Sequence, residues 1–133
     1  MKTKDLMMGD YISVKPSRMP IKVAAIHHKK VAYHAVINKL TWVRESLLEP
    51  ILLTPEILEK NGWYYNDEDA KFAPDTWCGG GLMLKGHDNT GYMVVVISDY
   101  DDKSTNNTPF ILNYVHQLQH ALRLRLSNKE IVL

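Results

Sequence analysis

Two histidines four residues apart, His116 and His120, lie in the stretch "NYVHQLQHALRL", which has the apolar spacing of a helix. Residues i and i+4 lie on one helix face, so both imidazoles can reach the same metal ion. A zinc-protease helix also carries glutamate after the first histidine as general base, and here that position is Gln117. We expect a hydrogen-bonded or solvated pair, and keep a metal-dependent enzyme that uses both histidines as an alternative.

The apolar residues of the same helix point away from the histidines. At about 100° per residue, Val115, Leu118 and Leu122 fall within a narrow arc of the helical wheel, and Ile111 falls on the same arc. Both histidines fall outside that arc. We therefore expect a docking helix whose histidines face away from the core.

A second cluster, "HHKK", contains His27, His28, Lys29 and Lys30 between two segments, 21–27 and 30–37, that are rich in β-branched residues. These segments predict a hairpin with its turn at residues 28 and 29. A basic hairpin tip can contact phosphate, so the four residues are candidate nucleic-acid contacts, together with the basic segment "RLRLSNK". The alternative is an ordinary solvated loop.

Aromatic side chains gather around the middle of the chain. Trp63, Tyr64, Tyr65 and Trp77 fall in segments expected to be irregular, where binding surfaces are common. They are candidate residues for binding a partner or ligand. The alternative, which we favour, is that they fill a seam between the two halves of the chain.

Other chemistries lack essential residues. Cys78 needs a neighbouring histidine to become a nucleophile, and "WCGGG" is better explained as a flexible turn. "GGGLMLKG" lacks the Ser or Thr of a phosphate loop, and "SDYDDKSTNNTPF" lacks the turn glycine of a calcium loop. We expect no cofactor, and the chain leans away from being an enzyme.

Length and composition favour one globular domain. The 133 residues are 45% hydrophobic with a formal net charge of +1, so no strong field directs the chain toward nucleic acid or lipid. One cysteine, no leader segment and no apolar run near about 20 residues predict a cytoplasmic protein without a membrane partner. Its oligomeric state is left open.

The pattern along the chain predicts an α+β fold. Strands at 11–15, 21–27, 30–37, 40–45 and 47–53 suggest an N-terminal SH3-like curled antiparallel sheet or small barrel. "LTPEILEKNGW" predicts a helix at 55–61, with Thr54 as cap and Gly62 as stop. A strand near Lys71, two strands in "LMLKG" and "YMVVVIS", the C-terminal helix and a last strand in "EIVL" follow. Residues 1–133 form one domain, with possible sub-modules 1–62 and 63–133.

The segments "LTPEILEKNGW" and "YVHQLQHAL…KEIVL" resemble a group of short gut-bacterial proteins that are often associated with phages and mobile elements. The resemblance covers about a quarter of the chain and carries no catalytic residues. It implies that "YVHQLQ" belongs to a shared helix and suggests a phage-related setting.

These observations favour a non-enzymatic binding or assembly module with a protein partner. A nucleic-acid-associated SH3-like module is the first alternative, and the metal-dependent enzyme that uses His116 and His120 is the second.

Overall fold

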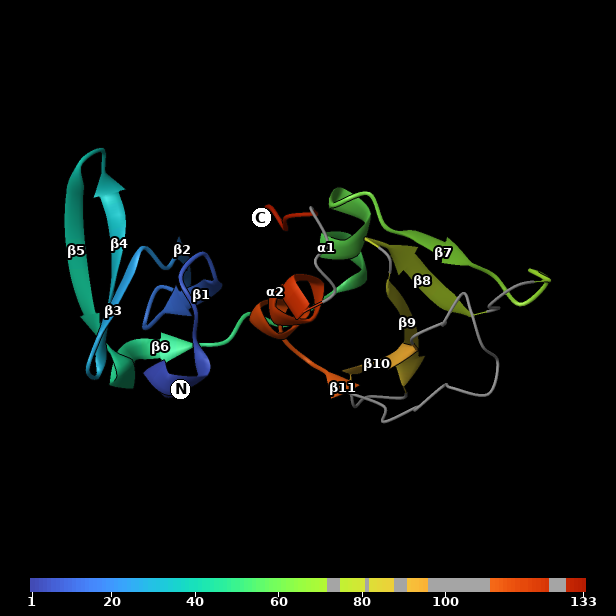
Figure 1. Ribbon diagram of the computed structural model, residues 1–133, viewed down its shortest axis with the longest axis horizontal. Helices are drawn as coiled ribbons and strands as arrows, with labels where there is room; N and C mark the ends of the chain where they lie inside the picture. Colours follow the sequence, from blue (N-terminus) through green and yellow to red (C-terminus); the bar gives the residue numbers. More distant parts are fainter. Residues whose placement is uncertain (72–74, 81, 88–90, 96–110, 125–128) are drawn as a thin grey trace. The chain divides into compact units, whose positions relative to one another are not determined.

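A computed structural model describes residues 1–71, 75–80, 82–87, 91–95, 111–124 and 129–133 (Figure 1). It contains helices and antiparallel sheets, which confirms the α+β class. The chain divides into two compact units. The first consists of Met1–Leu52, Tyr114–His116 and Leu133, and the second of Leu53–Asn113 and Gln117–Val132. The single domain with sub-modules 1–62 and 63–133 stays a prediction.

The first unit contains two three-stranded sheets, with the orders β2–β1–β6 and β3–β4–β5. Its elements are η1 (Thr3–Asp5), β1 (Tyr11–Val14), β2 (Met19–Lys22), β3 (Ala25–His27), β4 (Lys30–Val36), β5 (Lys39–Arg44), η2 (Glu45–Leu47) and β6 (Leu48–Glu49). The segment 21–27 is not one strand, because the chain leaves β2 after Lys22 and enters the other sheet at Ala25. The described residues therefore form no closed barrel.

Apolar side chains from both sheets make one core in the first unit. The buried cluster consists of Leu6, Ile12, Ile21, Val23, Val31, Val43 and Leu48. In β1, Ile12 is fully buried and Val14 packs against the cluster, and Ser13, which projects from the opposite face, is also buried.

The β4–β5 hairpin turns at Asn38, whose φ of +64° lies in the left-handed region that asparagine tolerates. Near the turn, the register shifts between His34 and Val36, which marks a β-bulge. Beyond the bulge, Val31 pairs with Val43, and both valines are buried. Pairs counted regularly from the turn would place Val31 opposite Arg44. The bulge shifts the register by one residue, so that Val31 and Val43 face each other in the core.

The second unit contains a five-stranded antiparallel sheet of order β11–β10–β9–β8–β7. Its strands are β7 (Tyr64–Asn66), β8 (Thr76–Gly79), β9 (Leu82–His87), β10 (Gly91–Val95) and β11 (Ile111–Leu112). The strand predicted in "LMLKG" is confirmed as β9, the central strand, and the one in "YMVVVIS" is confirmed as β10 as far as Val95, beyond which it lies outside the described residues. The prediction of a strand near Lys71 is wrong for Lys71, which lies in a bend. The turn predicted in "WCGGG" is present at Gly80, whose φ is +57°, but β8 extends to Gly79 and so includes the first part of that stretch.

Helix α1 (Pro55–Lys60) forms where the capping residues predict it. The Thr54 hydroxyl accepts a hydrogen bond from the Ile57 N–H at 3.3 Å. Gly62, with a φ of +81°, adopts the left-handed conformation that ends a helix. The helix ends at Lys60, one residue earlier than predicted.

Helix α2 (Val115–Leu124) begins after β11. Ile111 therefore does not belong to the helix, and its side chain is half exposed on β11. The Gln117 side-chain carbonyl accepts a hydrogen bond from the Asn113 N–H at 2.8 Å. The residue that replaces a catalytic glutamate thus satisfies a backbone donor beside the helix start.

The predicted strand in "EIVL" is wrong, because residues 129–133 form no regular element. Instead, the Asn61 side chain donates to the Val132 carbonyl at 2.9 Å and accepts from the Val132 N–H at 2.7 Å. Ile131 is buried. One side-chain amide thus gives Val132 the two bonds that a neighbouring strand would provide.

Three predicted segments lie wholly or partly outside the described residues: the turn "HDNTG", the polar loop "DYDDKSTNN" and the basic segment "RLRLSNK". The same holds for Phe72, Gly81 and the side chain of His87. Within the described ranges, no helix has the length and apolar character needed to cross a membrane.

Candidate functional site

Basic side chains from three neighbouring strands form one cross-strand row at an end of the β3–β4–β5 sheet. His27 pairs with Lys30, and Lys30 pairs with Arg44. Directly opposite residues project from the same face of a sheet, so all three side chains share one exposed face. Like charges placed directly opposite each other destabilise a sheet. The Lys30–Arg44 pair therefore lowers the stability of the sheet, and a bound anion would reduce the repulsion between the two charges.

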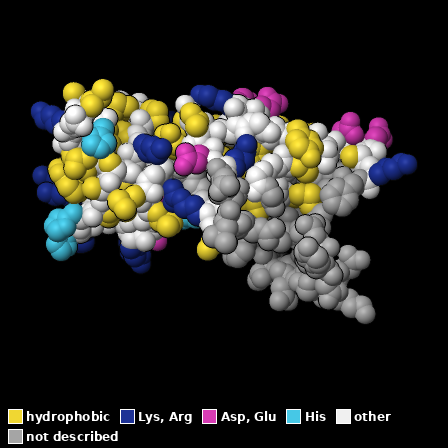
Figure 2. All heavy atoms as spheres, turned by 45° about the horizontal axis from the view of Figure 1, so that its top comes forward, with side chains coloured by type: hydrophobic (Ala, Val, Ile, Leu, Met, Phe, Trp, Pro, Cys, Tyr) yellow, Lys and Arg dark blue, Asp and Glu magenta, His cyan; other side chains and the backbone are white. Residues whose placement is uncertain are grey.

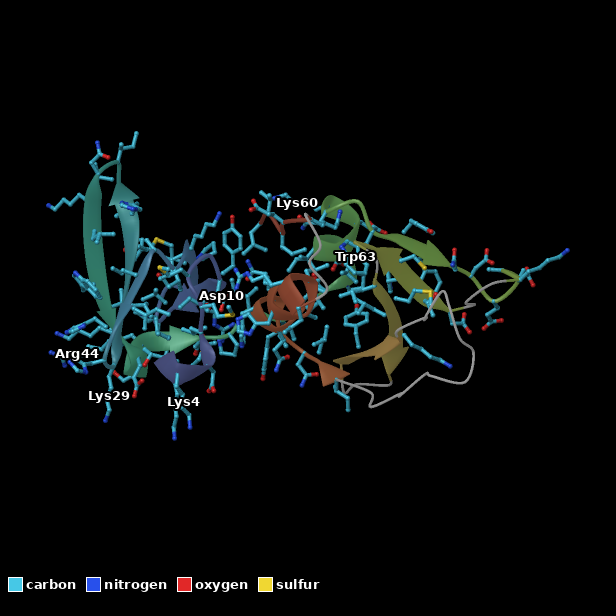
Figure 3. All side chains as sticks on the ribbon, viewed as in Figure 1. Lys4, Asp10, Lys29, Arg44, Lys60 and Trp63 are labelled. Carbon is cyan, nitrogen blue, oxygen red and sulfur yellow. The ribbon has the colours of Figure 1, made fainter. Side chains whose placement is uncertain are left out.

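A groove of about 760 Å³ lies at this end of the sheet, and we call it the basic groove. It is lined by His27, His28, Lys29, Lys30, Arg44, Glu45 and Ser46. Figure 3 shows Lys29 and Arg44 projecting from the same end of the sheet, and Figure 2 shows histidine and basic side chains over the first unit. A second groove of about 650 Å³ in this unit is lined by one basic residue besides histidine, Lys22. Of these two grooves, the basic groove therefore has more Lys and Arg side chains.

All four residues predicted as nucleic-acid contacts line the basic groove, and the predicted hairpin is confirmed by the pairing of Ile26 with Val31. Arg44 was not predicted as part of this group, because it joins the other cations only through the pairing of β4 with β5. The apolar residues of the two strands could have predicted its position. Aligning Val31 with Val43 as core partners places Lys30 opposite Arg44.

The hairpin tip is held by the N-terminal segment. The Thr3 hydroxyl lies 2.7 Å from the His28 carbonyl and 3.2 Å from a Glu45 carboxylate oxygen, so its one proton is shared between them. The Thr3 N–H donates to the same Glu45 oxygen at 3.1 Å. The Glu45 N–H in turn donates to the Lys29 carbonyl at 2.9 Å. These bonds fix the backbone that carries His28 and Lys29.

Glu45 is the one acid among the residues that line the basic groove. The hydrogen bond from the Thr3 N–H lowers the pKa of Glu45, and the Thr3 hydroxyl and the charge of Lys29 act in the same direction, against partial loss of hydration. The described ion pairs join Lys15 and Arg18 to Glu49, at 3.5 and 3.8 Å. Within the described ranges, none of the three Lys and Arg side chains of the groove forms an ion pair.

Aromatic rings adjoin the cations on the same sheet face. Trp42 precedes Arg44 by two residues on β5, so the two side chains share the face, and Trp42 is 46% exposed. The His27 ring lies edge-on to Trp42 at 6.4 Å between centroids, and to His28 at 4.2 Å. Trp42 pairs across the sheet with Ala32, a residue with a single methyl side chain. The indole thus stands beside a small neighbour rather than a bulky one.

The histidines of α2 differ from the sequence prediction. His116 is only 6% exposed, so the prediction that both histidines face away from the interior is wrong for it. The Tyr114 ring lies parallel to the His116 imidazole at 5.9 Å between centroids, and Gln119, one turn further on, is also buried. A helical wheel omits residues before the helix, so it could not include the Tyr114 ring that stacks with His116. Among the described residues, no group of three His, Cys, Asp or Glu side chains could hold a metal ion.

The four candidate partner-binding aromatics separate into two kinds. Trp63 and Trp77 are 3% and 9% exposed, whereas Tyr64 and Tyr65 are exposed on β7. Tyr65 lies 5.3 Å from Trp77 between ring centroids, and its hydroxyl donates to the Asp75 carboxylate at 3.1 Å. Partial loss of hydration and this carboxylate raise the pKa of Tyr65. Only the tyrosines present rings that a partner can reach.

Trp63 packs on the backbone of Gly79. A Cβ atom at Gly79 would lie 2.6 Å from Trp63 Cδ2, closer than real Cβ atoms come to other atoms. The glycine is therefore required by the ring above it. In the same strand, Cys78 is buried, and its Sγ lies 3.4 Å from Asn66 Nδ2 and 3.7 Å from Thr76 Oγ1. Both contacts are to uncharged groups that cannot act as a general base.

Comparisons with known protein families, curated proteins and solved structures gave no match.

Proposed function

We propose that this protein is a non-enzymatic binding module and that the basic groove binds a polyanionic ligand. The observation that carries the proposal is the Lys30–Arg44 pair, two like charges directly opposite each other on an exposed sheet face. Such a pair lowers the stability of the hairpin when the groove is empty. A bound anion converts this repulsion into two attractive contacts.

Two further features support a binding surface rather than a solvated loop. Lys29 adds a third cation to the groove, and the described carboxylates leave all three without an ion pair. The Thr3 bonds to His28 and Glu45 hold the tip in place before any ligand arrives. A fixed surface loses less conformational entropy on binding than a mobile one.

The test is binding of a fluorescent heparin oligosaccharide, measured by anisotropy at low and moderate salt. We expect affinity to fall by about tenfold or more between 50 and 200 mM salt, because charged contacts of this kind are screened. The variant Lys29→Gln/Lys30→Gln/Arg44→Gln should lose this binding.

Lys39→Gln is the matched control, because Lys39 lies at the other end of the same hairpin. Equal effects of the triple variant and the control, or no binding at 50 mM salt, would contradict the proposal.

A protein partner, the first expectation from the sequence, is the second candidate function. The observation that favours it is the exposure of Tyr64 and Tyr65 on β7, an edge strand of the five-stranded sheet in its described part. An edge strand can pair with an extended peptide. We expect peptides selected from a displayed random library to bind the chain but not Tyr64→Lys/Tyr65→Lys. Peptides that bind both equally would remove this candidate.

The wider setting belongs to the same proposal. We propose a cytoplasmic protein whose first unit is an open relative of SH3-like curled sheets, with a phage or mobile-element association suggested by the shared "LTPEILEKNGW" segment. A metal-dependent enzyme that uses His116 and His120 is the least supported alternative, because His116 is only 6% exposed.

A further inference from the structure

We infer that the polyanion is a single-stranded nucleic acid, with its phosphates at the basic groove and a base stacked on Trp42. This inference rests on the proposed function and names its ligand. It depends on the arrangement of cations and aromatic rings on one face of the β3–β4–β5 sheet.

The phosphate contacts come from Lys29, Lys30 and Arg44. Lys30 and Arg44 are neighbours across β4 and β5, and Lys29 is at the adjoining tip, so the three charges lie along one end of the sheet. Arginine and lysine neutralise backbone phosphates without reading sequence. These residues therefore account for affinity toward any nucleic acid.

Trp42 favours nucleic acid over other polyanions. It lies two residues from Arg44 on the same face, or about 7 Å along the strand. A single nucleotide can thus place its phosphate at Arg44 and its base against the indole. Sulfated sugars and acidic peptides offer no planar base to stack on an exposed ring.

Single strands fit this face better than duplexes do. Bases in a duplex stack on each other and are not available to a protein ring, whereas unpaired bases can be splayed onto a sheet surface. Ala25 and Ala32 occupy the same cross-strand row as Trp42, so the neighbours of the indole within that row are methyl groups, and the His27 ring lies edge-on to it. Ala32 is fully buried, so a base would stack on the exposed part of the Trp42 ring itself.

The test compares three probes on the full chain: a single-stranded oligonucleotide of about ten nucleotides, the same sequence as a duplex, and a heparin oligosaccharide. We expect the single strand to bind most tightly and to quench tryptophan fluorescence. Trp42 is 46% exposed, whereas Trp63 and Trp77 are nearly buried, so the quench reports on Trp42. The salt slope for the single strand should be about −2, from three contacts at about 0.7 each.

Trp42→Ala should weaken binding of the single strand by about 5- to 150-fold, because stacking of one base contributes that much, and should leave heparin binding unchanged. Trp42→Leu covers Ala32 with an apolar side chain but lacks a ring, so it keeps the test valid if the alanine variant folds poorly. Trp42→Phe should retain most of the affinity.

The outcomes separate the two proposals. Equal binding of all three probes, with no effect of Trp42→Leu, overturns the single-strand inference and leaves the polyanion proposal intact. Tighter binding of a polyglutamate peptide than of the oligonucleotide also overturns it. Absence of binding to every probe overturns both proposals.

Discussion

The two units of this chain use tryptophan in opposite ways. In the first unit, Trp42 stands half exposed beside cations on the outer face of a sheet. In the second unit, Trp63 and Trp77 are almost completely buried, and Trp63 lies directly on the backbone of Gly79. The contrast teaches that the number of aromatic residues says little about binding. The neighbours of each ring matter more, and of the three tryptophans it is Trp42 that has cations beside it on an open face.

Alanine substitutions at Trp63 and Trp42 test the comparison most strongly. Trp63→Ala should lower the free energy of unfolding by about 3 to 5 kcal/mol, because it removes a buried ring and leaves a cavity. Trp42→Ala should cost about 1 kcal/mol or less, since the ring is half exposed. Urea unfolding of both variants measures the difference, and equal losses would break the distinction between the two tryptophans.

Glycine substitutions test the packing of the Trp63 ring on Gly79 in the second unit. Gly79→Ala should cost about 1 to 3 kcal/mol, because its Cβ atom would overlap the Trp63 ring. Gly86→Ala, in the adjacent strand β9, is the matched control, because a Cβ atom there meets nothing within 4 Å. Thermal unfolding should separate the two variants clearly. A Gly86 variant as unstable as the Gly79 variant would show that ring contact is not the cause.

Acid titration tests the tip of the first unit. The folded pKa of Glu45 is lowered below its usual 4.5, so the stabilisation by its carboxylate is present above that value and is lost as the pH falls through the folded pKa. Glu45→Gln keeps an acceptor for Thr3 without the titration. We expect the Thr3 amide resonance to shift at acid pH in the parent chain only, and a matching shift in the variant would be evidence against this assignment.

Alkaline titration tests the exposed aromatic of the second unit and should give the smallest effect. The folded pKa of Tyr65 is raised, so its contribution to stability is present below the usual value of 10.0 and is lost as the pH rises through the raised one. Asp75→Asn removes the nearby charge and suits the backbone, because Asp75 has a φ of +55°. Tyrosinate absorbance, corrected with Tyr65→Phe, should appear at lower pH in the Asn variant.

Local features of the fold followed from the sequence. Thr54 and Gly62 determine the ends of α1 through bonds and backbone preferences within a few residues. The hairpin with Ile26 opposite Val31 followed from two β-branched segments separated by two residues. Such signals do not depend on distant parts of the chain.

The remaining features depend on contacts between distant residues. The division of the N-terminal strands into two sheets follows from the departure of the chain from β2 after Lys22, which alternation of residue types does not reveal. His116 is buried and stacks with the Tyr114 ring, which lies before the helix, and the hydrogen bonds between Asn61 and Val132 join segments far apart in sequence. The histidines and lysines of the basic groove were predicted from the sequence, whereas Arg44 was not, because it joins them only through strand pairing.

The bulge between His34 and Val36 restricts how the sequence of this hairpin can evolve. A regular register counted from the Asn38 turn would set Lys30 against Glu45, an attractive pair, but would remove Val31 from its buried partner Val43. The core therefore prevents the hairpin from sliding to relieve the repulsion between its cations. Arg44→Glu would relieve it directly, for a gain of about 0.2 to 1 kcal/mol. Under the proposed function, selection for stability and selection for binding therefore oppose each other at position 44.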